Sequence, residues 1–243
     1  MACVLVRRAY VENADLDTWP YTVPAVTDLA EQGLTFTRPV TFLVGENGSG
    51  KSTVAEALAE SFGLDPHGGK AGTKYASHRE MSILGEALKL STSPAGQNMR
   101  SGPRKARSGF FLRGETAMGM MSARSGWPGY WEGDTDTMSH GEGFLTVFDA
   151  MFARPGFYVL DEPESALSFS SSLRLVELLH RLGRTGAQVV CATHSPILAS
   201  TPGAAIYEFS ANGIASVAWE DLLIVEHWRR YLDAPQSYLR HLL

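Results

Sequence analysis

A glycine-rich segment at residues 45–52 has the spacing G-x-x-x-x-G-K-[ST]. In a loop of this pattern, successive backbone N–H groups surround a phosphate, and the start of the following helix adds about half a unit of positive charge. Lys51 is expected to reach the terminal phosphates, and Ser52 is expected to hold Mg²⁺. The pattern therefore predicts a nucleoside triphosphate site made of Gly45, Glu46, Asn47, Gly48, Ser49, Gly50, Lys51, Ser52 and Thr53.

Two adjacent carboxylates, Asp161 and Glu162, follow the apolar segment 157–160. A buried strand that ends in carboxylates presents them at the sheet edge where ligands collect in doubly wound folds. We expect Asp161 to enter the Mg²⁺ shell. Glu162 is expected to orient and polarise the attacking water, which is typically worth about 10² to 10⁴ in rate. Lys51 and the metal would stabilise charge on the transferring phosphoryl group.

A histidine, His194, follows a third apolar segment at residues 188–192. A single histidine after a strand often has a purely structural role. In this chain, however, the strand should end at the same sheet edge as the carboxylates. We therefore expect His194 to contact the γ-phosphate.

The segments around these groups predict an α/β fold. Residues 40–44 are typical of a buried strand, and residues 52–62 favour a helix that Gly63 can end. Residues 3–12 and 34–37 favour further strands. A strand, a glycine loop and a helix in this order indicate a P-loop NTPase.

Glycine and proline interrupt the periodicity between residues 64 and 108. We expect a single domain over residues 1–243 with a small, flexible helical and loop insertion at about 64–108. Basic side chains gather near its end, at Arg100, Arg104, Lys105, Arg107 and then Arg113. They could contact nucleotide phosphate or a nucleic-acid backbone, or they could pair with surface carboxylates in a solvated loop.

Three aromatic residues near the N-terminus, Tyr10, Trp19 and Tyr21, are candidates to stack on an adenine ring. Aromatic faces bind bases without base-specific hydrogen bonds. The alternative for each of them is an ordinary place in the core or at its rim.

The composition is that of an ordinary soluble globular protein, with 44% hydrophobic and 19% charged residues in a chain of 243. A net charge of −5 gives no overall attraction to nucleic acid or anionic membrane. Cys3 and Cys191 fit no disulfide or metal pattern, which favours a reduced, cytoplasmic compartment. Since no apolar run has the length of a membrane helix, we expect no transmembrane segment.

Ser139 stands three residues before Glu142, which is the spacing of a capping box ahead of an apolar segment at 144–152. With this segment included, the order of the motifs resembles that of the ABC-type ATPases. The motifs that carry the resemblance are Gly45–Ser52, Ser139–Gly143, Asp161–Pro163, Ser165–Leu167 and His194. They look more like the soluble recombination-repair ATPases than like transporter subunits, and nearly the whole chain is similar to stand-alone bacterial predicted ATPases of the AAA/ABC kind.

The resemblance implies an ABC-ATPase-like mixed sheet flanked by helices, with an N-terminal antiparallel β part. It also implies a head-to-tail homodimer that closes on ATP. In that dimer Ser139 and Gly141 of one copy would cover the γ-phosphate held by Lys51 of the other. Residues 165–168 would couple the two sites, and His194 would be the switch histidine. Two residues compete for the metal-contacting glutamine position of the family: Gln97, which sits in a glycine-rich stretch, and Glu115, which follows a predicted strand.

The interval between Lys51 and Ser139 contains no sustained heptads, so the coiled-coil arm of the repair-type relatives is not expected. The predicted function is ATP binding and Mg²⁺-dependent hydrolysis that closes and opens a dimer, coupled to DNA or a partner protein in repair or defence. One alternative is the ATPase subunit of a membrane transporter. Another is a slow ATP-dependent switch whose turnover is not essential.

Overall fold

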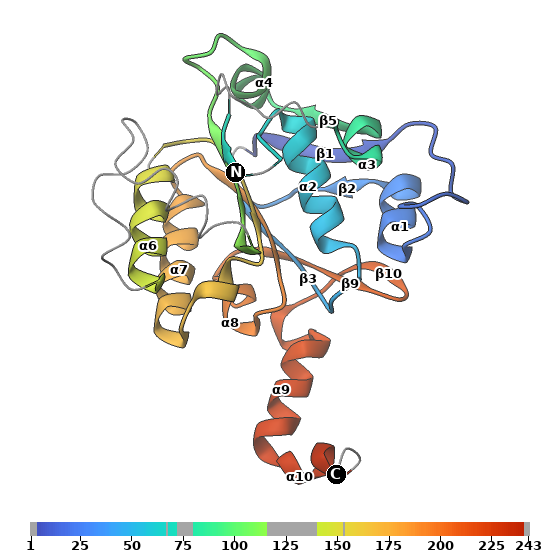
Figure 1. Ribbon diagram of the computed structural model, residues 1–243, viewed down its shortest axis with the longest axis vertical. Coiled ribbons are helices and arrows are strands. Elements are labelled where there is room, and N and C mark those ends of the chain that lie inside the picture. The colour runs from blue at the N-terminus through green and yellow to red at the C-terminus, as the bar shows by residue number, and fades with distance from the viewer. Residues whose placement is uncertain (1–3, 67, 72–79, 116–139, 153, 241–243) are drawn as a thin grey trace.

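The computed structural model describes residues 4–66, 68–71, 80–115, 140–152 and 154–240, and the fold is built around two β-sheets (Figure 1). The strands of the larger sheet are β3 (Val40–Gly45), β4 (Gly69–Lys70), β6 (Gly109–Arg113), β7 (Phe157–Asp161), β8 (Gln188–Thr193), β9 (Ala205–Ser210) and β10 (Gly213–Ser216). Their order across the sheet is β10-β9-β3-β8-β7-β6-β4. The smaller sheet has the order β2 (Leu34–Thr35), β1 (Val6–Val11) and β5 (Leu88–Thr92).

The five inner strands of the larger sheet, from β9 to β6, run parallel, and the edge strands β10 and β4 run antiparallel. Their side chains alternate between two hydrophobic cores. Phe42 and Val44 face one core and Leu43 faces the other, and all three are at most 1% exposed. Apolar runs without polar alternation therefore form these strands because both faces of the sheet are covered.

Helices cover the two faces of this sheet (Figure 1). The helices of the described residues are α1 (Pro24–Gln32), α2 (Lys51–Phe62), α3 (Ile83–Ala87), α4 (Pro94–Ser101), α6 (His140–Met151), α7 (Phe169–Leu182), α8 (Pro196–Ala199), α9 (Leu223–Asp233) and α10 (Pro235–Leu239). Side chains of α6, α7 and α8 belong to one core, and side chains of α1 and α2 belong to the other. The predicted α/β fold, with a mixed sheet flanked by helices and an N-terminal antiparallel part, is therefore confirmed.

The small antiparallel sheet is tied to the large one by a buried amide, that of Gln188. Its Oε1 accepts a hydrogen bond from the Val6 backbone N–H at 2.7 Å, and its Nε2 donates to the Val6 carbonyl at 2.9 Å. Gln188 is fully buried. Because β1 and β8 do not pair as strands, this side chain supplies the backbone of Val6 with partners that it would otherwise lack.

Part of the segment predicted as an insertion belongs to the small sheet. Strand β5 pairs antiparallel with β1 along its length, from Leu88 opposite Val11 to Thr92 opposite Val6. Residues 88–92 therefore complete a sheet that begins near the N-terminus. The flexibility expected of 64–108, and the single-domain assignment of 1–243, stay predictions.

Helices α9 and α10 project away from the two sheets at the end of the chain (Figure 1), and we call them the C-terminal arm. In α9 only Val225 is buried, whereas Trp228 is 50% and Leu232 is 70% exposed. None of the helices in the described parts of the chain is long and apolar enough to cross a membrane.

Candidate functional site

The glycine-rich loop lies between the end of β3 and the start of α2, as the sequence predicts. Gly48 and Gly50 have φ of 80° and 95°, which residues with a Cβ rarely adopt. A Cβ at Gly45 would lie 2.2 Å from the Phe209 carbonyl oxygen on the neighbouring strand, so this position requires glycine. The loop thereby brings its backbone N–H groups to the N-terminus of a 12-residue helix, an arrangement suited to binding phosphate.

Lys51 opens α2 and is only 3% exposed. Its Nζ donates a hydrogen bond to the carbonyl of Glu46 at 2.8 Å, within the loop. Burial lowers the pKa of Lys51, and nearby carboxylates act in the opposite direction, those of Glu162, Asp161, Glu164 and Glu46. The ammonium group is thus held at the loop by its surroundings, where it can approach a bound phosphate.

Asp161 ends β7 at the same edge of the sheet and is 7% exposed. Burial raises its pKa to about 6, against opposing contributions from a hydrogen bond with Ser52 and from the charge of Arg113. Its Oδ1 is buried and has no hydrogen-bond partner among the described residues. A buried carboxylate oxygen without a partner, beside a serine hydroxyl at a phosphate loop, fits the ligand set of Mg²⁺. Ser52 and Asp161 could therefore hold the metal, as the sequence predicts.

Glu162 follows Asp161 in the left-handed region, with φ of 48°, and its N–H donates to the Ala192 carbonyl at 2.9 Å. This places Glu162 beside the end of β8, where His194 lies. Nδ1 of His194 is 3.6 Å from Oε1 of Glu162. The side chains of Glu162 and His194 are partly exposed, at 29% and 43%, so both are open to a ligand from solvent. The structure thus brings together Glu162 and His194, two of the three predicted catalytic side chains.

Glu164 is a neighbour of this pair that the sequence analysis gave no role. Its Oε1 accepts hydrogen bonds from the Thr193 hydroxyl at 2.5 Å and from the His194 N–H at 2.9 Å. It lies in a one-turn 3₁₀-helix, Pro163–Ala166, that directly follows Glu162. Glu164 therefore fixes the backbone that carries His194. A carboxylate two residues after Glu162 was visible in the sequence, but its partners at the end of β8 were not.

Arg113 is a second residue that sequence reasoning placed elsewhere. It ends β6 in register with Asp161, and its Nε lies 4.0 Å from the Asp161 carboxylate. It also lies 3.6 Å from Glu56 and 3.8 Å from Glu115. Arg113 is therefore part of the carboxylate edge rather than of the basic group at 100–107.

The two candidates for the metal-contacting glutamine lie in different places. Gln97 belongs to α4, and its Oε1 accepts a hydrogen bond from Thr92 of the small sheet at 3.1 Å. In Figure 1, α4 lies at the opposite end of the molecule from α9 and α10. Glu115 lies two residues after the end of β6, and its side chain is 82% exposed. Of the two, Glu115 is the one at the carboxylate edge, while its role stays a prediction.

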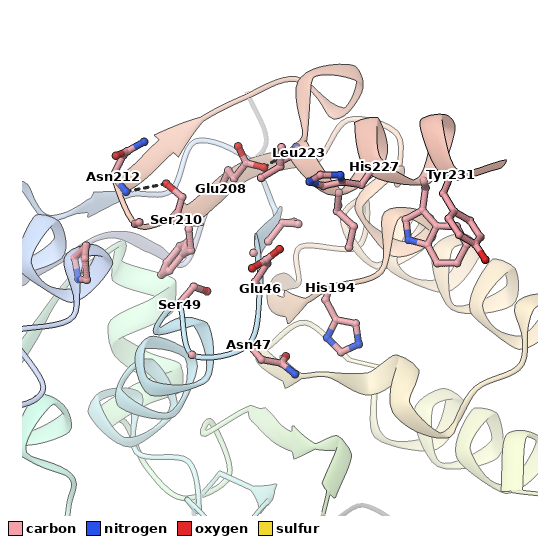
Figure 2. Close-up of a pocket in the computed structure, with 18 of the residues that line it drawn as sticks. Glu46, Asn47, Ser49, His194, Glu208, Ser210, Asn212, Leu223, His227 and Tyr231 are labelled. Atoms are coloured by element: carbon pink, nitrogen blue, oxygen red, sulfur yellow. Dashed lines mark hydrogen bonds between the residues drawn. The ribbon is translucent and has the colours of Figure 1, made fainter. Parts of the chain in front are cut away.

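A cavity of about 1300 Å³ opens beside the loop. Glu46, Asn47 and Ser49 of the loop line it together with His194, and they face residues of β9, the β9–β10 turn and the C-terminal arm (Figure 2). The Ser49 hydroxyl is buried without a partner among the described residues. The cavity therefore continues from the phosphate loop toward the arm.

Two family models match this chain. One, described as "AAA domain, putative AbiEii toxin, Type IV TA system", matches residues 137–200, and the other, described as "AAA domain", matches residues 28–99. The solved structures that share the fold include the following two. The first is cbiO1 from Clostridium perfringens, part of the ABC transporter complex cbiONQ, with a TM-score of 0.52 and 15% identity over 98% of this chain and 99% of that one. The second is the SMC head domain from Thermotoga maritima, with a TM-score of 0.50 and 16% identity over 88% and 98%.

The chain is a P-loop ATPase domain of the AAA/ABC type. This ATPase domain is 30% identical over 172 residues to a Streptomyces coelicolor protein, "Putative ABC transporter ATP-binding protein", in an alignment that covers 65% of this chain and 59% of that protein. It is 29% identical over 193 residues to the ribose import ATP-binding protein RbsA 1 of Burkholderia cenocepacia, over 71% of this chain and 37% of that protein. The chain thus spans less than two thirds of the length of these relatives.

The segment expected to cover a second nucleotide site is only partly described in this ATPase domain. Ser139 lies outside the described residues. Gly141 lies in the first turn of α6, which begins at His140. Thr53 follows Ser52 in the first turn of α2. The roles of Ser139, Gly141 and Thr53 at a nucleotide stay predictions.

Proposed function

We propose that this ATPase domain binds ATP at Gly45–Thr53 and hydrolyses it in a Mg²⁺-dependent reaction. The observation that carries the proposal is the convergence of three strand ends on one edge of the sheet. Lys51 and Ser52 follow β3, Asp161 and Glu162 come from the end of β7, and His194 follows β8. A phosphate chain on the loop would place its terminal group between Lys51 and these side chains.

Each side chain has a distinct part in the proposed reaction. Glu162 orients and polarises the attacking water, and Lys51 offsets negative charge on the transferring phosphoryl group. His194, held by Glu164, donates a hydrogen bond to the terminal phosphate. When bound by Ser52 and Asp161, Mg²⁺ supplies Lewis-acid stabilisation of the phosphate oxygens. The electrostatic support of the reaction therefore comes from three neighbouring strand ends.

The proposed catalytic unit is a homodimer that closes head to tail on ATP. Ser139 and Gly141 of one copy would then complete the site at Lys51 of the other. This part of the proposal is supported by the resemblance of the motif order to the ABC-type ATPases and by the fold shared with an SMC head domain. Hydrolysis at Glu162 would reopen the pair.

A glutamine substitution at Glu162 tests the reaction and the dimer together. Glu162→Gln keeps the size of the side chain and removes the carboxylate, so we expect ATP binding and dimerisation to persist while turnover falls by about 10² to 10⁴. Light scattering with saturating Mg-ATP measures the dimer, and phosphate release measures turnover. Glu31→Gln, at an exposed position of α1, is the matched control. A Glu162→Gln variant that stays monomeric with ATP would contradict the dimer.

We further propose that the dimer acts on DNA or on a partner protein. Support for a DNA contact comes from the basic residues Arg104, Lys105 and Arg107, which belong to the loop between α4 and β6. Replacing all three with alanine should weaken DNA binding and make it less sensitive to salt. The slope of the logarithm of the binding constant against the logarithm of the salt concentration should become shallower by about one unit for each phosphate that these side chains neutralise in the wild type. Unchanged affinity and slope would remove these residues from a DNA interface.

A second candidate function is that of the ATPase subunit of a membrane transporter. The observation in its favour is that the Streptomyces coelicolor and Burkholderia cenocepacia relatives are named as transporter or import ATP-binding proteins. Affinity purification of Glu162→Gln with ATP, from detergent-solubilised cells, distinguishes the two candidates. Capture of an integral membrane protein favours the transporter, and capture of DNA or a soluble protein favours the repair-type role.

A further inference from the structure

The first turn of α9 attaches the C-terminal arm to the large sheet and its core. Oε1 of Glu208, on β9, accepts a hydrogen bond from the Leu223 N–H at 2.8 Å, and Val225 belongs to the core that α6, α7 and α8 cover. Beyond this turn, contacts within the arm hold it together, and the rings of Tyr231 and Tyr238 lie edge to face with centroids 5.8 Å apart. The arm therefore keeps its own structure and leaves much of its surface uncovered.

An uncovered apolar stripe runs along α9. Trp228 and Leu232 stand four positions apart, which places them on the same face of the helix, and they are 50% and 70% exposed. The next residue, Asp233, is exposed, and its carboxylate has no ion-pair partner within the described residues. We call Trp228, Leu232 and Asp233 the arm stripe.

A stripe of the same kind lies at the start of α7. Phe169 and Leu173 are also four positions apart, and they are 67% and 48% exposed. Arg174 follows them and is exposed, and in the parts of the chain that the structure describes its guanidinium has no ion-pair partner. We call Phe169, Leu173 and Arg174 the α7 stripe. Since both stripes are exposed, they do not cover each other within one chain, and their charges are opposite.

Both stripes adjoin the sheet edge that carries the phosphate loop. Helix α7 follows β7 through the one-turn 3₁₀-helix Pro163–Ala166, so it starts where the carboxylates of β7 lie. Trp228 lines the cavity beside the loop, and His227 and Tyr231 of the arm lie on the His194 side of that cavity (Figure 2). In Figure 1 the arm extends beyond this edge, at the end of the molecule away from α4. In the proposed dimer a second copy covers this edge, so the surface left uncovered here faces that copy.

None of the three aromatic residues near the N-terminus lines this cavity. Tyr21 is buried at 4% exposure, and Tyr10 lies on β1, where the Arg8 guanidinium sits 5.9 Å from its ring centroid. Trp19 is 63% exposed and precedes α1. The uncovered aromatic surface beside the cavity therefore comes from the arm.

We propose that the arm stripe of each copy packs on the α7 stripe of the other copy when the dimer closes on ATP. This inference rests on the proposed function, because the head-to-tail dimer brings the two edges together. A two-fold dimer forms the same contact twice, so two complementary surfaces on one chain are sufficient. The apolar side chains of the two stripes become buried against each other, which stabilises the closed dimer, and Asp233 pairs with the partner's Arg174.

The contact stabilises the closed dimer from outside the nucleotide site. Leu232 and Asp233 of the arm do not line the cavity beside the loop, and neither do the residues of the α7 stripe. Changes at these positions should therefore alter the affinity between the two copies and leave nucleotide binding by a single copy unchanged.

Charge reversal tests the contact in the full chain carrying Glu162→Gln, with saturating Mg-ATP. Light scattering over a range of protein concentrations gives the dissociation constant of the dimer. Arg174→Asp and Asp233→Arg should each raise this constant about tenfold, because each change places two like charges together at both contacts. The two changes combined in one chain should restore the constant to within about threefold of the parent, since the pair forms again with its charges exchanged. Arg184→Asp, at an exposed position beyond the other end of α7, is the control and should leave the constant unchanged.

A second set of variants tests the apolar part of the contact. Leu232→Ser and Phe169→Ser should each raise the dissociation constant about tenfold, because each removes apolar surface that the contact buries. Leu16→Ser, which changes a side chain that is 38% exposed outside both stripes, should leave it unchanged. ADP titrated by calorimetry should bind every variant as it binds the parent, which checks that the phosphate loop is intact.

The outcomes separate this contact from the proposed function. If the Glu162→Gln parent dimerises with ATP while the single reversals have no effect, or while the combined reversal brings no recovery, the contact alone is overturned. A parent that stays monomeric contradicts the proposed dimer and the contact with it. Loss of ADP binding in Arg174→Asp or Asp233→Arg would also overturn the contact, because the stripes would then act through the nucleotide site.

Discussion

The carboxylate of Asp161 lowers the stability of the metal-free protein. Burial raises its pKa from 3.8 to about 6, so the folded state binds a proton more tightly than the unfolded state. The stability that this proton contributes is fully present below pH 3.8 and is lost as the pH rises through about 6. At about 1.4 kcal/mol per pKa unit, the charged form costs about 3 kcal/mol above that pH. The neutral amide of Asp161→Asn avoids this cost, which already includes the attraction of Arg113, so we expect a gain of about 3 kcal/mol at about pH 8.

Urea unfolding in EDTA measures this gain at about pH 8 and again at about pH 5. The gain should shrink at the lower pH, because the wild-type carboxyl becomes protonated there. Asp149→Asn is the matched control, since that carboxylate is 68% exposed and pairs with Arg181 on the surface. Mg²⁺ with nucleotide should stabilise the wild type more than Asp161→Asn. An Asp161→Asn variant less stable than the wild type at the higher pH in EDTA would refute the reasoning.

Three further substitutions test the Gln188 contact between the two sheets and two residues near the carboxylate edge, Glu164 and Arg113. Gln188→Ala leaves the Val6 backbone buried without its side-chain partners, and urea unfolding should show a loss of about 2 to 4 kcal/mol. Glu164→Ala removes the acceptor that holds the His194 backbone, so turnover should fall at least about tenfold while ADP affinity, measured by calorimetry, stays unchanged. Arg113→Gln removes a cation that competes with the metal for the Asp161 carboxylate, so half-maximal ATPase activity should need about threefold less Mg²⁺. An increased Mg²⁺ requirement would contradict this account.

Much of the fold and most of the phosphate site could be predicted because their signals are local. The apolar run that forms β3, the glycines that the loop requires and the stop of α2 at Gly63 each depend on neighbouring residues in the sequence. Gly63 indeed has φ of 88° and donates to two carbonyls of the last helical turn. The convergence of Asp161, Glu162 and His194 followed from the rule that parallel strands end at one edge.

The parts that sequence reasoning missed depend on pairing between distant segments. The pairing of β5 with β1 joins residues about eighty positions apart, and a short alternation around Leu90 gives no register. The placement of Arg113 next to Asp161 depends on the β6–β7 register in the same way. The C-terminal arm borders the cavity beside the loop. The pairing of β9 with β3 that holds this part of the sheet together joins segments that lie far apart in the sequence.

The position of β3 in the sheet has a consequence for synthesis on the ribosome. Both of its neighbours, β8 (Gln188–Thr193) and β9 (Ala205–Ser210), are translated long after the glycine loop. A strand in a parallel sheet needs its neighbours to form the hydrogen bonds of its backbone. While the nascent chain ends before β8, neither neighbour of β3 is present, so the position of the loop is not fixed. A ribosome-stalled chain that exposes only the residues before β8 should therefore fail to retain nucleotide, even though the complete phosphate loop has emerged.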